Sequence, residues 1–191
     1  MSADERTLAF YDAEAAAYAA ASHEARLVAD FILELPRGAH ALDLGCGGGA
    51  DSAALREAGF RVTSVDASAG LAREAKQRWN IDARVMRFDE LNFVDAFEGV
   101  WASASLHHAR SDELPGIFAA IRRAVRESGV FHATLKLGED RRDRLGRFFC
   151  AMSEDALQAL AVDWRDVRID GGDGSGYDGE SATWLRLRAV R

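Results

Sequence analysis

Four glycines within five residues form the part of the sequence best suited to hold a ligand: Gly45, Gly47, Gly48 and Gly49. They follow the apolar run at 41–44 and precede small helix-forming residues at 50–58. A strand that breaks into glycine and restarts as a helix exposes backbone amides, and no Cβ keeps a ligand away from them. The spacing therefore predicts a binding loop between a strand and a helix.

The glycine spacing fits two kinds of ligand. Residues 45–50 satisfy G-x-G-x-x-[GA], a pattern that holds a dinucleotide pyrophosphate, and Asp66 lies about 20 residues further on, where a ribose contact is expected. Counted from Asp43, the same stretch satisfies [DE]-x-G-x-G-x-G. A carboxylate beside the loop would repel a pyrophosphate and attract a cation.

S-adenosylmethionine carries an amine and a sulfonium, offers a ribose to Asp66 and has no phosphate. The Asp43 carboxylate therefore favours this ligand over a nicotinamide dinucleotide, which stays as the alternative. A structural role also stays open for Asp43, in which its carboxylate accepts hydrogen bonds from loop amides.

Asp66 follows the short β-type run at 61–65. Ligands of open α/β sheets bind outside the carboxyl ends of the strands, so this carboxylate is placed to meet one. Its two oxygens only accept hydrogen bonds, which suits the two hydroxyls of a ribose. Capping of the next helix is the alternative role, but Ser68 is better suited to it because it directly precedes the helical run.

A resemblance to a known family rests on four segments: LDLGCGGG at 42–49, SVDAS at 64–68, Asp89-Glu90, and FEGVWASASLHH at 97–108. In this order and at this spacing they resemble the successive motifs of the class I S-adenosylmethionine-dependent methyltransferases. The resemblance covers roughly residues 11–137. It implies a Rossmann-like fold, S-adenosyl-L-methionine as the cofactor, and methyl transfer as the activity.

The resemblance also implies a set of residues that contact the cofactor. Asp89 would accept a hydrogen bond from the adenine amino group, with the backbone near Phe88 and Glu90 lining the adenine pocket. For Asp89 the alternative is a solvated acid in a turn. The expected cofactor-binding residues are Tyr11, Tyr18, Asp43, Gly45, Cys46, Gly47, Gly49, Asp66, Ala67, Phe88, Asp89, Glu90, Ser103 and Leu106.

The N-terminal tyrosines and the loop cysteine each have two interpretations. Tyr11 and Tyr18 belong to a YD-x-x-A-x-x-Y pattern, which by the resemblance folds over the cofactor. Packing against the core is the alternative for both rings. Cys46 is expected to be a small filler in the glycine loop, with a reactive thiol as the alternative.

His107 and His108 follow the predicted strand at 97–103, where the resemblance implies that the methyl acceptor lies. Methyl transfer from a sulfonium depends mostly on proximity, alignment and exclusion of water. An acceptor that must lose a proton also needs a base, and histidine titrates in the useful range. Both histidines are therefore candidate catalytic residues, and a ring hydrogen-bonded to the backbone is the structural alternative.

The composition excludes several classes of protein. The chain has 191 residues, 48% of them hydrophobic, and a net charge of −7, which argues against binding to nucleic acid or to an anionic membrane. Cys46 and Cys150 show neither metal-ligand spacing nor a disulfide framework, so no metal is expected. With no membrane-spanning run and no signal peptide, a cytoplasmic location is expected.

Alternating strand and helix patterns predict the fold class α/β. Two helices are expected within 4–34, the second capped by Ser22, and further helices at 50–58, at 69–79, and after a cap at Ser111 or Asp112. Strands are expected at 41–44, 61–65, 83–87, 97–103 and, after a turn at 127–129, at 130–137. Such alternation gives a doubly wound parallel sheet with helices on both faces.

The C-terminal third is expected to hold a helix at 153–160 and a β-hairpin formed by 164–169 and 183–190. By the resemblance, this hairpin adds an antiparallel strand and completes a Rossmann-like sheet of seven strands. The glycine-rich stretch at 171–179 between its arms is expected to be a disordered tip or a mobile flap. The arginine-rich stretch at 141–147 is expected to be a solvated loop, with a lid over an anionic acceptor as the alternative.

These patterns predict one methyltransferase domain over 1–191: N-terminal helices covering the cofactor site (1–36), a cofactor-binding core (37–137), and a tail helix with a β-hairpin (138–191). The expected acceptor is a small molecule, with an anionic one as an option. The candidate residues of a pocket for the methyl acceptor are His107, His108, Trp101 and Lys136. The alternatives are an NAD(P)-dependent oxidoreductase and a non-catalytic S-adenosylmethionine-binding protein. Nothing in the sequence specifies an oligomeric state.

Overall fold

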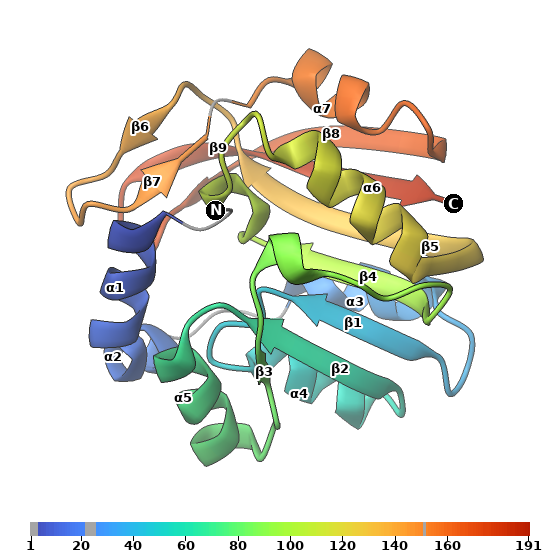
Figure 1. The fold of residues 1–191 in the computed structure, drawn as a ribbon, viewed down its shortest axis with the longest axis horizontal. Coiled ribbons are helices and arrows are strands. Elements are labelled where there is room, and N and C mark those ends of the chain that lie inside the picture. The colour runs from blue at the N-terminus through green and yellow to red at the C-terminus, as the bar shows by residue number, and fades with distance from the viewer. Residues whose placement is uncertain (1–3, 22–25, 151) are drawn as a thin grey trace.

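The computed structural model describes residues 4–21, 26–150 and 152–191, and for residues 26 and 27 it describes the backbone alone. Its centre is a seven-stranded β-sheet (Figure 1). The strands of this sheet are β1 (His40–Leu44), β2 (Arg61–Asp66), β3 (Arg84–Val85), β4 (Phe97–Ser103), β5 (Val125–Lys136), β8 (Arg165–Ser175) and β9 (Ser181–Val190). A separate two-stranded sheet pairs β6 (Arg141–Arg142) with β7 (Phe148–Phe149).

The seven strands lie in the order β3-β2-β1-β4-β5-β9-β8. The pairs from β3 to β5 are parallel, and β9 is antiparallel to both β5 and β8. This is the Rossmann-like, doubly wound arrangement predicted from the sequence, with its antiparallel C-terminal hairpin, so the expected fold class is confirmed. Because β1, β2 and β4 run parallel side by side, their carboxyl ends meet at one edge of the sheet.

Helices cover both faces of the sheet (Figure 1). Adjacent residues of β4 show the division, because Val100 packs into the cluster that includes Phe118, whereas Trp101 packs into the cluster that includes Phe31.

In the described part of the chain, no helix combines the length and the apolar character needed to cross a membrane. The helices are α1 (Glu5–Ala13), α2 (Ala15–Ala20), α3 (Arg26–Glu34), α4 (Ala50–Glu57), α5 (Ala69–Trp79), α6 (Leu114–Ala124) and α7 (Glu154–Leu160), with 3₁₀ turns η1 (Phe88–Glu90) and η2 (Leu106–His108).

Helix capping follows the sequence in part. Ser68 caps α5 as predicted, accepting a hydrogen bond from the Leu71 amide at 3.0 Å. The predicted cap of α6 at Ser111 or Asp112 is wrong: the cap residue is Glu113, and it makes no side-chain capping bond. The Asp112 carboxylate is instead held by the guanidinium of Arg110. The Ser22 cap lies outside the described residues.

Three strands differ from their predicted lengths. The turn expected at 127–129 lies inside β5, at a bulge where the pairing with β4 shifts register. The flap expected at 171–179 is strand β8 as far as Ser175, because β9 pairs with it residue by residue. At the other edge, β3 has only two residues rather than five. In the first two cases long-range strand pairing overrides local turn propensity.

Gly99 on β4 marks the point where α3 comes closest to the sheet. A Cβ at this position would lie 2.6 Å from the Phe31 ring and 2.6 Å from the Leu35 side chain. We expect Gly99→Val to lower the free energy of unfolding by about 1–3 kcal/mol, because the two buried side chains must move to admit it. Urea unfolding followed by circular dichroism measures the change.

Gly116→Ala is the matched control for this variant. Gly116 lies in the first turn of α6 with open space around its Cβ position, so the alanine should leave stability unchanged or raise it by about 0.4–1 kcal/mol. Equal unfolding midpoints for the two variants would contradict close packing of α3 on β4.

Candidate active site

The glycine loop joins β1 to α4 at the carboxyl edge of the sheet. Gly45 and Gly47 have φ values of +81° and +52°, in the left-handed region that favours glycine. A Cβ on Gly45 would lie 2.4 Å from the Ser105 Cβ, so the loop packs directly on the segment after β4. At Gly47 the nearest atom to a Cβ would be a Tyr18 ring carbon at 3.6 Å. The loop therefore presents its backbone at Gly47 toward Tyr18.

Asp66, the last residue of β2, holds two loops together. One carboxylate oxygen accepts the Gly47 amide at 2.8 Å, and the other accepts the Ser68 amide at 2.8 Å. Burial raises the pKa of Asp66, against the lowering effect of the two amides. Each oxygen keeps acceptor capacity beyond its one backbone donor. The carboxylate is thus fixed in place and still able to accept from a ligand.

Asp43 is buried behind the same loop. Its carboxylate accepts a hydrogen bond of 2.6 Å from the Ser52 hydroxyl. Burial, with Asp51 nearby, raises the pKa of Asp43 to about 8. Asp51 in turn accepts a hydrogen bond of 2.8 Å from the Trp101 indole. Three acidic side chains, counting Asp66, therefore surround the glycine loop, and a positively charged ligand bound there would favour their ionised forms.

Three cavities open at this edge of the sheet and share Tyr18, Ser103 and Ala104. The α1 cavity lies between α1 and the end of β2, the glycine-loop cavity lies over the loop itself, and the hairpin cavity, of about 540 Å³, lies toward β8 and β9. The α1 cavity is lined by the predicted residues Asp66, Ala67 and Phe88, the glycine-loop cavity by Asp43 and Cys46, and the hairpin cavity by His107. Four further predicted residues each line two of the cavities: Tyr11, Gly45, Gly47 and His108.

Four predicted residues line none of these cavities. The Leu106 side chain is fully buried in the core, and Gly49 sits at the start of α4, where a Cβ would meet Ala75. The Asp89 side chain is 46% exposed and lies 3.6 Å from the guanidinium of Arg87. The Glu90 carboxylate accepts the Arg87 amide. Only Phe88 of the predicted adenine-binding segment therefore reaches the α1 cavity.

Helix α1 reaches the site through Tyr11 and stands across the strand ends (Figure 1). The Tyr11 hydroxyl lies 2.9 Å from His108 Nε2, and His108 Nδ1 lies 2.6 Å from the Phe148 carbonyl. Because a carbonyl only accepts, Nδ1 carries the proton and Nε2 accepts from Tyr11. Burial lowers the pKa of His108 to about 4, so the ring is neutral. Arg147 also donates to the Tyr11 oxygen, at 3.1 Å.

His107 lines the hairpin cavity and, unlike His108, does not line the α1 cavity. Its Nδ1 accepts the Lys136 amide at 3.3 Å, which leaves the ring proton on Nε2. Its ring lies 5.0 Å from the Phe149 ring and 5.7 Å from the Trp184 ring. Burial, with His108 adjacent, lowers the pKa of His107 well below its usual value. Both predicted histidines are therefore uncharged and buried.

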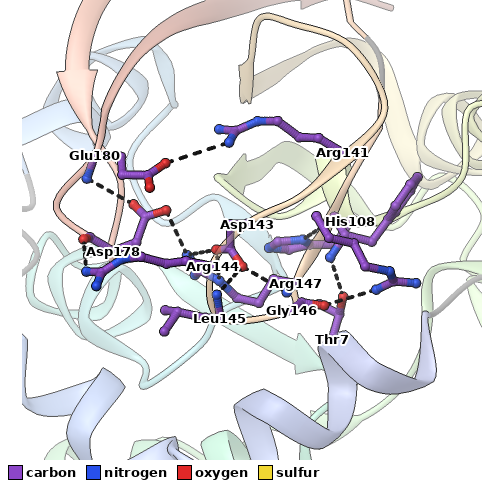
Figure 2. Close-up of polar contacts among 12 residues, drawn as sticks. Thr7, His108, Arg141, Asp143, Arg144, Leu145, Gly146, Arg147, Asp178 and Glu180 are labelled. Carbon is purple, nitrogen blue, oxygen red and sulfur yellow. Dashed lines mark hydrogen bonds and ion pairs between the residues drawn. The ribbon is translucent and has the colours of Figure 1, made fainter.

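The arginine-rich stretch folds into the small β6–β7 hairpin rather than a solvated loop (Figure 2). Arg147 is 3% exposed and forms an ion pair of 2.7 Å with the fully buried Asp143. Near α1, Arg142 binds both oxygens of Asp4, at 2.8 and 2.7 Å. The solvated interpretation is therefore wrong for Arg147, while Arg142 keeps 37% exposure of its side chain.

The cavity lining includes residues that the sequence did not single out. Arg87 and Ser68 line the α1 cavity, and Trp184 and Arg186 line the hairpin cavity. Alternation along β9 could have placed Trp184 and Arg186 on one face of that strand. Trp101, which we expected near an acceptor, lies instead in the cluster with Phe31 and lines none of the three cavities. Among the described residues, no group of three or more His, Cys, Asp or Glu could hold a metal ion.

Comparison with known structures supports the fold. A Burkholderia thailandensis 1,6-didemethyltoxoflavin-N1-methyltransferase, solved with 1,6-didemethyltoxoflavin and S-adenosylhomocysteine, superposes with a TM-score of 0.72 at 22% identity, covering 100% of this chain and 91% of that one. A methyltransferase from Methanosarcina mazei gives 0.74 at 16% identity, with coverages of 85% and 96%. Haemonchus contortus phosphoethanolamine N-methyltransferase 2 gives 0.70 at 15% identity, with coverages of 88% and 52%.

No curated protein matches the sequence. Residues 41–129 match a family model described as a methyltransferase domain, and this segment contains all but the first residue of β1, together with β2 to β4, the glycine loop, Asp66 and the two histidines. This segment is thus similar to a methyltransferase domain, and the whole chain has the fold of S-adenosylmethionine-dependent methyltransferases, some of them solved with S-adenosyl-L-methionine or S-adenosylhomocysteine bound.

Proposed function

We propose that the chain methylates a small molecule bound in the hairpin cavity. The observation that carries this proposal is the meeting of all three cavities at Tyr18, Ser103 and Ala104. S-adenosylmethionine supplies a methyl group on a sulfonium, open to in-line displacement. With the cofactor in the α1 and glycine-loop cavities, its methyl would lie near the shared residues, and the hairpin cavity would hold the acceptor opposite.

The residues of the first two cavities fit the parts of the cofactor. Asp66 has acceptor capacity for the ribose hydroxyls, and Phe88 offers an apolar surface to the adenine. Asp51 would face the cofactor's ammonium, and a cation bound there would also favour the ionised form of Asp43. The same charges disfavour a pyrophosphate, which argues against the oxidoreductase alternative. We include Tyr11, Tyr18 and Gly47 in this site because they line its walls.

A small acceptor is supported by the size and the lining of the hairpin cavity. Its volume of about 540 Å³ lies within the usual range for sites that bind small ligands. Aromatic and titratable side chains line it, among them Phe149, Trp184 and His107, which favours catalysis over cofactor binding alone. The Burkholderia enzyme was solved with 1,6-didemethyltoxoflavin and the Haemonchus enzyme with phosphomonomethylethanolamine, both of which are small molecules.

We propose that His108 and Tyr11 together accept a proton where the acceptor must lose one. Both line the α1 cavity and the hairpin cavity, so they stand at the border where transfer would occur. The acceptor proton passes to the Tyr11 oxygen while the Tyr11 proton passes to His108 Nε2. His107 is less suited, because its Nδ1 lone pair already accepts the Lys136 amide.

Asp66→Asn tests the cofactor site. The amide keeps one acceptor for the two loops but removes the charge, so affinity for S-adenosylmethionine should fall about 10–100-fold, or about 1.5–3 kcal/mol. Calorimetry measures the change, and thermal unfolding verifies the fold. Asp82→Asn is the control, since this side chain is 84% exposed and should leave affinity unchanged. An unaltered affinity of Asp66→Asn would remove Asp66 from the site.

Asp43→Asn should stabilise the ligand-free protein while weakening cofactor binding. The folded-state pKa of Asp43, about 8, lies above the ordinary value of 3.8, so the protein loses stability as pH rises between these values. Asparagine does not titrate, and its advantage should therefore grow from pH 5 to pH 7.5 by about 3 kcal/mol. Thermal unfolding at both pH values measures it. A variant that is less stable by the same amount at both would contradict the raised pKa.

The protonation state of His108 can be observed directly. We expect nitrogen-15 NMR to show a neutral ring with the proton on Nδ1 from about pH 5 to 8, titrating near the pKa of about 4. Tyr11→Phe should raise this pKa, because it removes the donor that favours the neutral ring. Titration of His108 near 6.5 in the unmodified protein would contradict the burial of its ring.

A further inference from the structure

Lys136, the last residue of β5, is buried in the wall of the hairpin cavity. The residue is 5% exposed, and its ammonium nitrogen has no hydrogen-bond partner among the described residues. Burial lowers the pKa of Lys136, because the ammonium has lost water without gaining an acceptor. Lys136 thus brings an ammonium without a hydrogen-bond partner to the cavity proposed to bind the molecule that is methylated.

Two aromatic rings hold the Lys136 head in place. Its ammonium lies 4.5 Å from the centre of the Phe149 ring and 5.5 Å from the centre of the Trp184 ring. Attraction to the ring faces compensates part of the lost hydration, but it leaves all three N–H donors without an oxygen. The rings also line the cavity and fix the direction from which an acceptor oxygen can approach.

The charges around the cavity favour an anion. Lys136, Arg147 and Arg186 line it, against a single carboxylate among its described lining residues, Asp173. Arg147 is occupied by Asp143, whereas the Lys136 ammonium has no such partner. The cavity therefore carries positive charge in a chain whose net charge is −7.

Asp178 is a second acidic group close to this cluster, besides Asp143. Its side chain is fully buried at the tip between β8 and β9, and one oxygen lies 3.9 Å from Arg147 (Figure 2). A Cβ on Gly176 would lie 2.5 Å from both the Lys136 ammonium and an Asp178 oxygen, so the two charges approach the same point without pairing. Asp178 does not line the cavity, which leaves the lysine available to a ligand.

We infer that Lys136 binds an anionic group, a carboxylate or a phosphate, on the small molecule that the chain methylates. This inference rests on the proposed function. Binding of that anion would supply the oxygen acceptors that the ammonium lacks, and Arg186 would add charge at the rim. The Phe149 and Trp184 rings would pack on the body of the molecule beside its charged group.

The experiment uses benzoate, phenyl phosphate and benzamide as probes, titrated into the full chain saturated with S-adenosylhomocysteine and followed by NMR. Benzoate or phenyl phosphate should shift the Trp184 indole signal with a saturable curve, and neutral benzamide should not. Lys136→Met should weaken the acid's binding at least about tenfold, and Lys136→Arg should restore it. Calorimetry with S-adenosylhomocysteine should show an unchanged cofactor site in every variant.

Asp178→Asn is the matched control, because it removes the neighbouring charge without touching the lysine. It should leave the affinity for the acids unchanged or raise it. If Asp178→Asn weakens binding as much as Lys136→Met does, the lysine only holds the hairpin tip and the inference is wrong. Equal binding of benzamide and benzoate, or no shift with either acid, would also overturn it.

The same titration separates this inference from the proposed function. Binding of benzoate through Lys136, with no methyl transferred to any small acid, would contradict the proposed function and leave the anion site standing. Methyl transfer to small neutral molecules that is indifferent to Lys136→Met would support the proposed function and overturn the anion site.

Discussion

The site depends first on the Asp66 carboxylate, which joins two loops that come from different strands. One oxygen holds the Gly47 amide of the glycine loop and the other holds the Ser68 amide at the start of α5. These bonds are possible because β1 and β2 pair in parallel and end at the same edge. A charged acceptor held by backbone donors has little freedom to move, so it is preorganised for a ligand's hydroxyls. The fold and the binding chemistry therefore meet in one residue.

A second network joins segments that are far apart in the sequence. Arg147 lies against Asp143 and Tyr11, and Tyr11 in turn contacts His108 (Figure 2 shows the β6–β7 part). Thr7 accepts the Phe148 amide, and Asp4 binds Arg142, so α1 is attached to the β6–β7 hairpin along its length. This attachment forms one wall of the α1 cavity, and a buried ion pair at its centre tolerates little displacement because either charge alone would be costly.

The sequence predicted the parts of this structure that local patterns determine. The apolar runs before and after the glycine loop, the acid at the end of β2 and the helical period of α5 all lie where the patterns placed them. The extension of β8 into the glycine-rich stretch was not predictable, because it depends on pairing with β9 rather than on its own residues. Burial of Arg147 was likewise hidden, since its partners are brought to it by three separate elements.

The wrong cap of α6 has a local origin. Asp112 is a good capping residue by type, but Arg110 two positions away competes for its carboxylate. For Lys136, the sequence predicted a position at the end of a strand. That its ammonium lacks an oxygen partner was not predictable, because this depends on where the tip between β8 and β9 places Asp178. The type of a residue determines which hydrogen bonds and ion pairs its side chain can form, and the tertiary structure determines which partners lie close enough to form them.

Charge divides the site into two halves on either side of Ser103 and Ala104. Three carboxylates surround the glycine loop, where the cofactor's positive charge would lie, and lysine and arginine line the hairpin cavity beyond. Transfer of the methyl group removes the sulfonium charge, so the attraction that holds the cofactor is weaker after the reaction than before it. The ammonium that Asp43 and Asp51 would face stays on the product, so the product loses only the part of this attraction that acted on the sulfonium. The carboxylates that draw the charged cofactor in therefore also favour exchange of the spent cofactor for a fresh one.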